Sequence, residues 1–181
     1  KKFSLLWKLF LLTLPLGWIA RKRTGDLNAN NGSEAALLFT SGSSGDPKGV
    51  PLSHENLLSN CEQIARTGLF GKNDKLLANL PLFHSFGFTV AMLYPLLNDL
   101  VMVCSPSPLD LKSTLRAIEE EKVEIVLGTP TFLRGYLRKA GIKQLDSVRY
   151  VVAGAEKTPV GLKEKWEAFC QCDYLEGYGL T

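Results

Sequence analysis

The chain of 181 residues is long enough for one well-packed domain or for part of a larger one. With 45% hydrophobic and 22% charged residues, its composition is typical of a globular protein and excludes a disordered one. The net charge is +3, but residues 1–23 hold six basic residues and no acidic one. The remainder is therefore mildly acidic, which argues against a nucleic-acid-binding groove.

The basic residues of this N-terminal segment surround an apolar stretch. Apolar residues dominate from Phe3 to Ala20, about the minimum length for a membrane span, although Lys8 and Pro15 interrupt it. We interpret residues 1–26 as a membrane-interface helix at the cytoplasmic face of the cell membrane. The alternative is an amphipathic helix packed on its own protein. A polar linker is expected at 27–34.

After the linker, short apolar runs alternate with helical patterns. A buried strand is expected at 35–40, and further strands are expected at 75–81, 100–106, 123–129, 148–155 and 173–179. Helices are expected at 53–69, 86–97, 110–122, 130–141 and 159–170, with Ser53 and Asp110 as N-caps, Pro130 in a first turn and Gly141 at a stop. In the first helix, one face is expected to carry Leu57, Leu58, Cys61, Ile64 and Ala65. The alternation predicts an α/β fold, with a largely parallel sheet and helices on both faces, but no strand order.

The cysteines give no sign of a metal site. Cys61, Cys104, Cys170 and Cys172 form no CxxC pair and lie in apolar contexts, far along the chain from the two histidines. We expect reduced, buried thiols.

Candidate site residues lie in the loops after the strands, because ligands of parallel sheets bind beyond the carboxyl ends of the strands. These loops are TSGSSGDPKG, PLFHSFG, GTPT, GAEKT and EGYGLT. The first combines hydroxyls, glycines and Lys48, which suits a phosphate chain, although a flexible surface loop is the alternative. A P-loop nucleotide hydrolase is disfavoured, because Pro47 replaces the second glycine of that motif and Gly49 its magnesium-binding hydroxyl residue.

The whole string LLFTSGSSGDPKGVPLSHENL (37–57) resembles the phosphate-binding signature of the adenylate-forming, or AMP-binding, superfamily. Three further likenesses follow in the family's order. LPLFHSFGF (80–88) resembles its acyl-pocket segment, VVAGAEK (151–157) its adenine-side loop, and EGYGLT (176–181) the start of its YGxTE motif. Within the superfamily, these motifs are most similar to the acyl-ACP synthetase part of bifunctional 2-acylglycerophosphoethanolamine acyltransferase/acyl-ACP synthetases (Aas).

The resemblance implies that residues 35–181 are part of the large N-terminal domain of a fatty-acid-activating ligase. A fatty acid and Mg·ATP would give acyl-AMP and pyrophosphate, and a phosphopantetheine thiol of acyl carrier protein or coenzyme A would then accept the acyl group. The product would serve lysophospholipid reacylation. The alternatives are a long-chain acyl-CoA synthetase and a membrane-anchored nucleotide-binding or interaction domain without ligase activity.

Roles follow from the resemblance, residue by residue. The ATP phosphates would be bound by Thr40, Ser41, Gly42, Ser43, Ser44, Gly45 and Lys48, and the adenine by Gly154, Ala155, Glu156, Gly177, Tyr178 and Gly179. The acyl pocket would contain Phe83, His84, Phe86 and Gly87, and the catalytic residues would be Thr181, His84 and Lys48. Three of these have structural alternatives: a core or capping histidine for His84, a turn aromatic for Tyr178, and a surface ion pair with Lys157 for Glu156.

Several parts of the family's machinery are expected beyond these residues. The resemblance places a magnesium-binding glutamate directly after Thr181, followed by a ribose-binding aspartate, a hinge and a small domain with the catalytic lysine. We therefore expect an internal part of a longer chain that is inactive alone.

Overall fold

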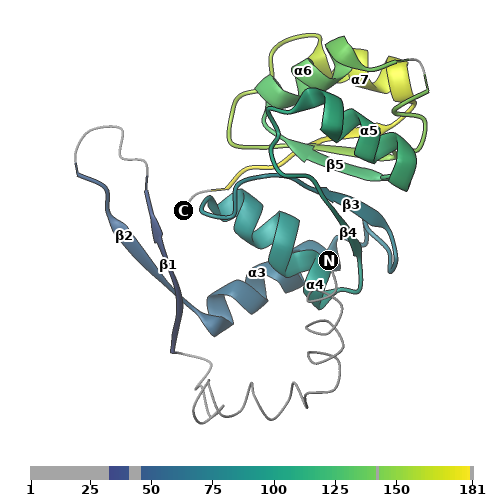
Figure 1. Cartoon of the computed structure of the whole chain (residues 1–181). Helices are drawn as coiled ribbons and strands as arrows, with labels where there is room; N and C mark the ends of the chain where they lie inside the picture. The colour runs from purple at the N-terminus through teal and green to yellow at the C-terminus, as the bar shows by residue number, and fades with distance from the viewer. Residues whose placement is uncertain (1–32, 41–45, 142, 180–181) are drawn as a thin grey trace, which may run out of the picture. The chain divides into compact units, whose positions relative to one another are not determined.

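The computed structural model describes residues 33–40, 46–141 and 143–179, and from Glu34 onward the chain forms one compact unit (Figure 1). The strands are β1 (Glu34–Phe39), β2 (Gly49–Ser53), β3 (Lys75–Ala78), β4 (Val101–Cys104), β5 (Ile125–Gly128), β6 (Tyr150–Ala153) and β7 (Asp173–Glu176). The helices are α3 (His54–Arg66), the π-helix η1 (Phe86–Leu93), α4 (Tyr94–Leu97), α5 (Leu111–Glu121), α6 (Pro130–Lys139) and α7 (Leu162–Cys170).

Five parallel strands form the main sheet, in the order β4-β3-β5-β6-β7. The predicted α/β fold with a largely parallel sheet is confirmed. After β3 the chain adds β4 on one side of it, and then returns to add β5, β6 and β7 on the other side. The strand order therefore reverses between β3 and β5.

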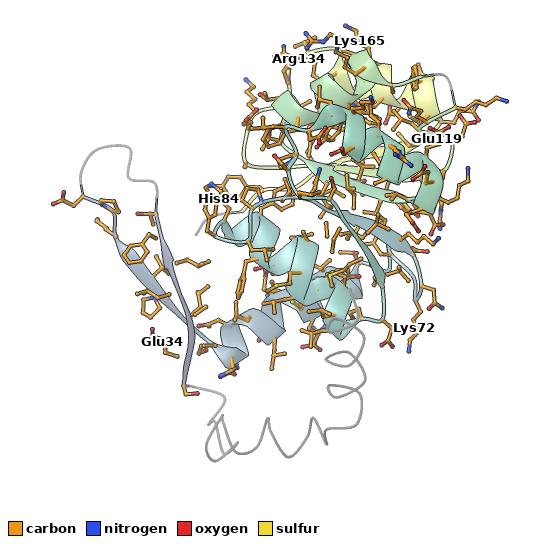
Figure 2. The ribbon with its side chains drawn as sticks, viewed as in Figure 1. Glu34, Lys72, His84, Glu119, Arg134 and Lys165 are labelled. Carbon is orange, nitrogen blue, oxygen red and sulfur yellow. The ribbon has the colours of Figure 1, made fainter. Side chains whose placement is uncertain are left out.

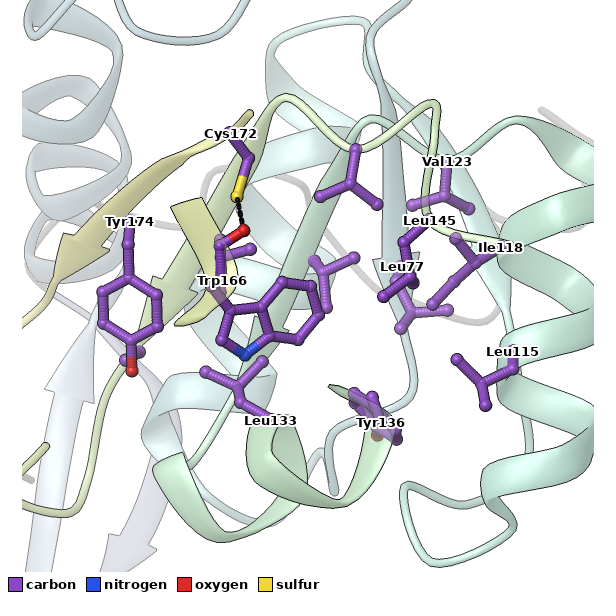
Figure 3. Packing of buried hydrophobic residues seen from close by; sticks show 14 of the residues in the cluster. Leu77, Leu115, Ile118, Val123, Leu133, Tyr136, Leu145, Trp166, Cys172 and Tyr174 are labelled. Carbon is purple, nitrogen blue, oxygen red and sulfur yellow. Dashed lines mark hydrogen bonds between the residues drawn. The ribbon is translucent and has the colours of Figure 1, made fainter. Parts of the chain in front are cut away.

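Helices cover both faces of this sheet, as predicted (Figure 1). On one face, Leu77 and Val126 pack with α5, α6 and α7, around the fully buried Trp166 and Tyr136 (Figure 3). On the other face, apolar residues at alternate strand positions pack with Ala91 of η1. Burial on both faces explains why the strands are continuous apolar runs in the sequence.

A separate antiparallel hairpin joins β1 to β2. The prediction of a buried strand at 35–40 is wrong in its burial, because Leu37 and Phe39 are 48% and 62% exposed. The partner strand β2 was not predicted, because Gly49 and Pro51 disfavour strands. Pro51 pairs with Leu37 and is tolerated because a two-stranded ribbon has a free outer edge on each strand.

The predicted helix ends are largely confirmed. Ser53 caps α3 through a reciprocal pair of bonds with Asn56, and Asp110 caps α5 by accepting from the Ser113 amide. Hydrogen bonding from the Ser113 side chain, and next from the Ser113 amide, lowers the pKa of Asp110. Leu58 is an exception to the predicted apolar face of α3, since it is 46% exposed. The predicted helix at 86–97 begins as the π-helix η1, and the α-helical turn α4 follows with Pro95, which lacks an amide donor, in its first turn.

All four thiols are free, but two of them are not buried as predicted. Cys61 and Cys172 are buried, and burial raises the pKa of Cys61. Cys104 is exposed because it lies on β4, the edge strand of the sheet, and Cys170 is half-buried at the end of α7.

The predicted membrane-interface segment at 1–26 and most of the linker at 27–34 lie outside the described residues. The linker's last residue, Glu34, begins β1. Among the residues that are described, no helix has the length and hydropathy needed to cross a membrane.

Replacing Tyr136 by phenylalanine should destabilise the fold at neutral pH. The Asn79 amide donates to the Tyr136 hydroxyl over 2.8 Å, and that hydroxyl donates to the Pro108 carbonyl over 3.2 Å. The variant leaves both buried partners unsatisfied, at a cost of about 1–2 kcal/mol in the free energy of unfolding. Urea denaturation of both proteins would measure this cost.

The same pair of proteins tests the titration of Tyr136. Burial raises the pKa of Tyr136 from its ordinary 10 to about 12. Its contribution to stability is therefore complete below pH 10 and is lost as pH rises towards 12. The stability advantage of the wild type should fall by at most about 1.4 kcal/mol per pH unit in that interval, so the initial difference of about 1–2 kcal/mol should be cancelled and reversed towards pH 12. A difference that stays constant there would contradict the assignment.

Candidate functional site

The predicted site loops after β3, β5, β6 and β7 belong to one edge of the sheet, because these strands are parallel and their carboxyl ends meet there. The reversal of strand order falls between β3 and β5. In open α/β sheets, such a reversal marks the crevice where ligands bind. The loop after β3 holds the predicted acyl-pocket segment, and the loop after β5 is GTPT.

His84 is exposed where the loop after β3 enters η1 (Figure 2). Its ring lies 4.8 Å from the ring of Phe83, centroid to centroid, and Phe83 is 75% exposed. The His84 amide donates to the Pro81 carbonyl, and the His84 carbonyl accepts from the Phe88 amide. The alternative of a buried core histidine is therefore wrong, and the hydrogen bonds by which His84 shapes the loop come from its backbone.

Gly87 allows the backbone of η1 to touch this loop. A Cβ at position 87 would lie 2.2 Å from the Pro81 carbonyl oxygen, which is closer than any side-chain carbon can approach. Only glycine fits here without movement of the backbone. Gly87 thus holds the predicted acyl-pocket segment in shape and is itself buried.

The structure brings the predicted acyl-pocket and adenine segments into contact. A Cβ on Gly154 would lie 3.1 Å from the Phe86 ring, so the ring covers the Gly154 backbone. Two main-chain bonds extend the sheet beyond its strands: the Gly154 amide donates to the Gly128 carbonyl over 3.1 Å, and the Gly177 amide donates to the Ala153 carbonyl over 2.7 Å. The loops after β6 and β7 are therefore tied to the ends of β5 and β6, and Phe86 packs against the loop after β6.

Glu156 is held by a residue to which the sequence assigned no role. Its Oε2 accepts from the Thr131 hydroxyl over 2.7 Å and from the Thr131 amide over 3.2 Å. These bonds, rather than an ion pair with Lys157, engage the carboxylate. Thr131 ends the GTPT segment, which was singled out by its position after a strand, and it is the second residue of α6; nothing local signals its partner. Ala155, just before Glu156, has a left-handed backbone with φ of 66°.

Tyr178 and Gly179 follow β7. The Tyr178 side chain is 90% exposed, and Gly179 has no atom within 4 Å of a Cβ position. An exposed aromatic ring at the carboxyl edge suits stacking on a base, as the resemblance implies. It suits a turn aromatic equally well.

The ends of the predicted phosphate loop are bonded to each other. The Thr40 amide donates to the Lys48 carbonyl over 3.0 Å, and the Lys48 amide donates to the Thr40 hydroxyl over 3.2 Å. The Lys48 side chain is exposed. The other predicted residues of this loop, and the predicted catalytic threonine, lie outside the described residues: Ser41, Gly42, Ser43, Ser44, Gly45 and Thr181.

A surface groove of about 390 Å³ lies elsewhere, along β4 and α5. Arg116 and Glu120 line it and form an exposed ion pair of 2.8 Å. None of the predicted site residues lines this groove, so it is separate from the candidate site.

A parallel sheet with site loops at a reversal of strand order defines the class of open α/β ligand-binding domains. The model of the AMP-binding enzyme family matches residues 13–181. The chain belongs to this family.

Curated relatives and solved structures agree with this assignment. The chain is 34% identical to a long-chain-fatty-acid–CoA ligase of Bacillus subtilis over 151 residues, covering 81% of this chain and 27% of that protein. It is 29% identical to a feruloyl-CoA synthase of Amycolatopsis over 175 residues, covering 94% of this chain and 35% of the relative. This chain therefore spans only about a third, or less, of these relatives.

Among solved structures, ATP-bound MatB from Rhodopseudomonas palustris matches with a TM-score of 0.75 and 28% identity, over 83% of this chain and 30% of that one. The inhibitor-bound N-terminal domain of FACL13 from Mycobacterium tuberculosis matches with a TM-score of 0.72 and 27% identity, over 80% of this chain and 36% of that one. The described fold is thus that of the N-terminal domain of adenylate-forming enzymes.

Proposed function

We propose that this chain is the ATP-binding core of a ligase that activates a fatty acid as its acyl adenylate and then transfers the acyl group to a phosphopantetheine thiol. The observation that carries the proposal is the contact between Phe86 and Gly154 beside the reversal of strand order. Acyl adenylation needs the carboxylate next to the α-phosphate. An acyl segment packed against an adenine loop supplies that proximity.

In the proposed reaction, a carboxylate oxygen attacks the α-phosphorus and the bond to the β-phosphate breaks, releasing pyrophosphate. This kind of transfer depends on positioning and on stabilising charge. Lys48 and the loop at 40–45 would bind the outer phosphates, and Thr181 the α-phosphate. His84, exposed beside Phe83, would lie where the carboxylate enters.

Magnesium is proposed to accompany ATP and to offset its charge. Among residues 33–40, 46–141 and 143–179, no group of three or more His, Cys, Asp and Glu side chains gathers to hold a metal ion. We therefore assign none of the described residues to magnesium.

The acid and the acceptor are proposed from different observations. The phenylalanines of the loop after β3 favour an apolar acid, and a fatty acid agrees with the name of the Bacillus relative. The motif likeness favours acyl carrier protein as acceptor and lysophospholipid reacylation as the use of the product. The names of the relatives favour coenzyme A, which is the second candidate. Residues 1–26 are proposed to bind the cytoplasmic face of the membrane, close to the lipid substrate.

The test is ATP–pyrophosphate exchange by the full-length protein that contains this sequence. We expect exchange only when a long-chain fatty acid is present, because formation of the adenylate must be reversible before the thiol enters. A protein that binds ATP but shows no exchange with any fatty acid would contradict the ligase and favour the nucleotide-binding domain without ligase activity.

The acceptor is tested separately, by adding either coenzyme A or holo acyl carrier protein to the same protein. Mass spectrometry would detect the thioester that forms. A product on the carrier protein alone would support the motif likeness, whereas a product on coenzyme A alone would support the second candidate.

A further inference from the structure

We infer that Thr131 and Glu156 form a clamp that fixes the adenine loop, so that Glu156 acts by positioning this loop rather than by contacting the base. This inference rests on the proposed function, since it concerns how the same site holds its nucleotide. It gives a role to Thr131, to which the sequence motifs assign none. The pair is called the Thr131–Glu156 clamp below.

The carboxylate of Glu156 is bonded at the N-terminus of α6. Glu156 Oε2 accepts both the hydroxyl and the amide of Thr131, over 2.7 and 3.2 Å. Thr131 directly follows Pro130, the first residue of α6, so its amide has no acceptor within the helix. A carboxylate at a helix N-terminus is also favoured by the helix dipole. The carboxylate oxygen is thus engaged by the protein itself.

The backbone between Gly154 and Glu156 is strained, and each of these two residues is anchored. Ala155 has a φ of 66°, a conformation that strains residues other than glycine. On one side of it, Gly154 is held by the Gly128 carbonyl and covered by the Phe86 ring. On the other side, the clamp holds Glu156. With one anchor removed, the strained residue is free to relax, and the loop moves with it.

The position of the adenine loop should affect binding of the nucleotide and not the chemical step. Adenine does not take part in the proposed reaction, so its contacts are the same before and during adenylation. Loss of such contacts weakens binding without slowing the chemical step, and it therefore raises KM while kcat is unchanged. A glutamate that contacted the reacting phosphates would instead affect kcat.

The test uses the full-length protein and two measurements, calorimetric binding of ATP and the kinetics of ATP–pyrophosphate exchange. Thr131→Val removes the hydroxyl and should raise both Kd and KM for ATP about threefold, while Glu156→Ala removes both bonds and should raise them about tenfold. In each variant, kcat should stay within about twofold of wild type. Thr131→Ser should restore wild-type values. Glu120→Ala, which removes a comparably exposed carboxylate on α5, is the matched control and should have no effect.

Double substitution separates a clamp from two independent contacts. Thr131→Val combined with Glu156→Ala should be no worse than Glu156→Ala alone, because both remove one interaction. Additive losses, or a loss in kcat confined to Glu156→Ala, would overturn the inference. ATP binding that responds as expected in a protein without fatty-acid-dependent exchange would support the clamp and sink the proposed ligase. Fatty-acid-dependent exchange with wild-type kinetics in all variants would contradict the clamp and support the proposed ligase.

Discussion

Lys48→Ala is expected to lower kcat/KM for fatty-acid-dependent ATP–pyrophosphate exchange about a hundredfold, the usual effect of losing one group that stabilises charge in the transition state. The proposed target is the leaving pyrophosphate. The substitution should not disturb the hairpin, because Lys48 bonds to Thr40 only through its backbone amide and carbonyl, and alanine retains both. Steady-state exchange kinetics with the full-length protein would measure the change.

Lys72→Ala is the matched control for this experiment. Lys72 is also an exposed lysine, but it pairs with Asp99 over 2.9 Å and lies before β3, away from the carboxyl edge of the sheet. It should leave the exchange unchanged. Equal activity of Lys48→Ala and wild type would contradict the assignment of Lys48 to the proposed phosphate site and would favour the alternative of a flexible surface loop.

Gly87→Ala is expected to reduce the free energy of unfolding by about 3 kcal/mol, near the upper end of what overpacking usually costs. The added Cβ would lie 2.2 Å from the Pro81 carbonyl oxygen. A backbone atom cannot rotate away as a side chain can, so η1 and the loop before it must separate. Urea denaturation would measure the loss, and weaker fatty-acid-dependent exchange should accompany it.

Gly135→Ala provides the comparison, since Gly135 also lies within a helix. There, a Cβ would meet the Leu111 side chain at 3.3 Å, and the end of a leucine side chain can move. Alanine also favours a helix over glycine by about 1 kcal/mol. We expect no net loss of stability from Gly135→Ala. If the two substitutions cost the same, the contact at Pro81 would not be the reason that residue 87 is glycine.

The parallel sheet could be predicted because its signal is local. β5 is buried along its whole length, so the sequence from Ile125 to Gly128 is apolar without alternation, and a capped helix follows it. The strand order could not be predicted, because it depends on pairings between segments far apart in the chain. The hairpin was missed for the opposite reason: its local signal is weakened by Gly49 and Pro51.

In the candidate site, too, features with a local sequence signal could be predicted, and features that depend on contacts between distant segments could not. Motif likeness selected Phe86 and Gly154 separately, but their contact depends on how η1 packs over β6 and is not encoded in either segment alone. The exposure of His84 and the partner of Glu156 are likewise properties of the folded chain. Thr131 could have been found only by asking which loop faces the one after β6, since no feature of GTPT itself indicates a bond to a carboxylate.

The two bonds that extend the sheet past β6 and β7 join main-chain atoms only: the amide of Gly154 to the carbonyl of Gly128, and the amide of Gly177 to the carbonyl of Ala153. A mutation changes a side chain but leaves the backbone carbonyl in place. The hydrogen bonds of this main-chain scaffold, which lies under the proposed adenine loop, therefore do not depend on which side chains positions 128 and 153 carry, although a Cβ at Gly128 would press on the Leu133 side chain at 3.0 Å and restricts the choice there. Side chains around the loops can diverge to accept new acids while this scaffold stays in place, so evolutionary change in specificity need not disturb the part of the site proposed to hold the nucleotide.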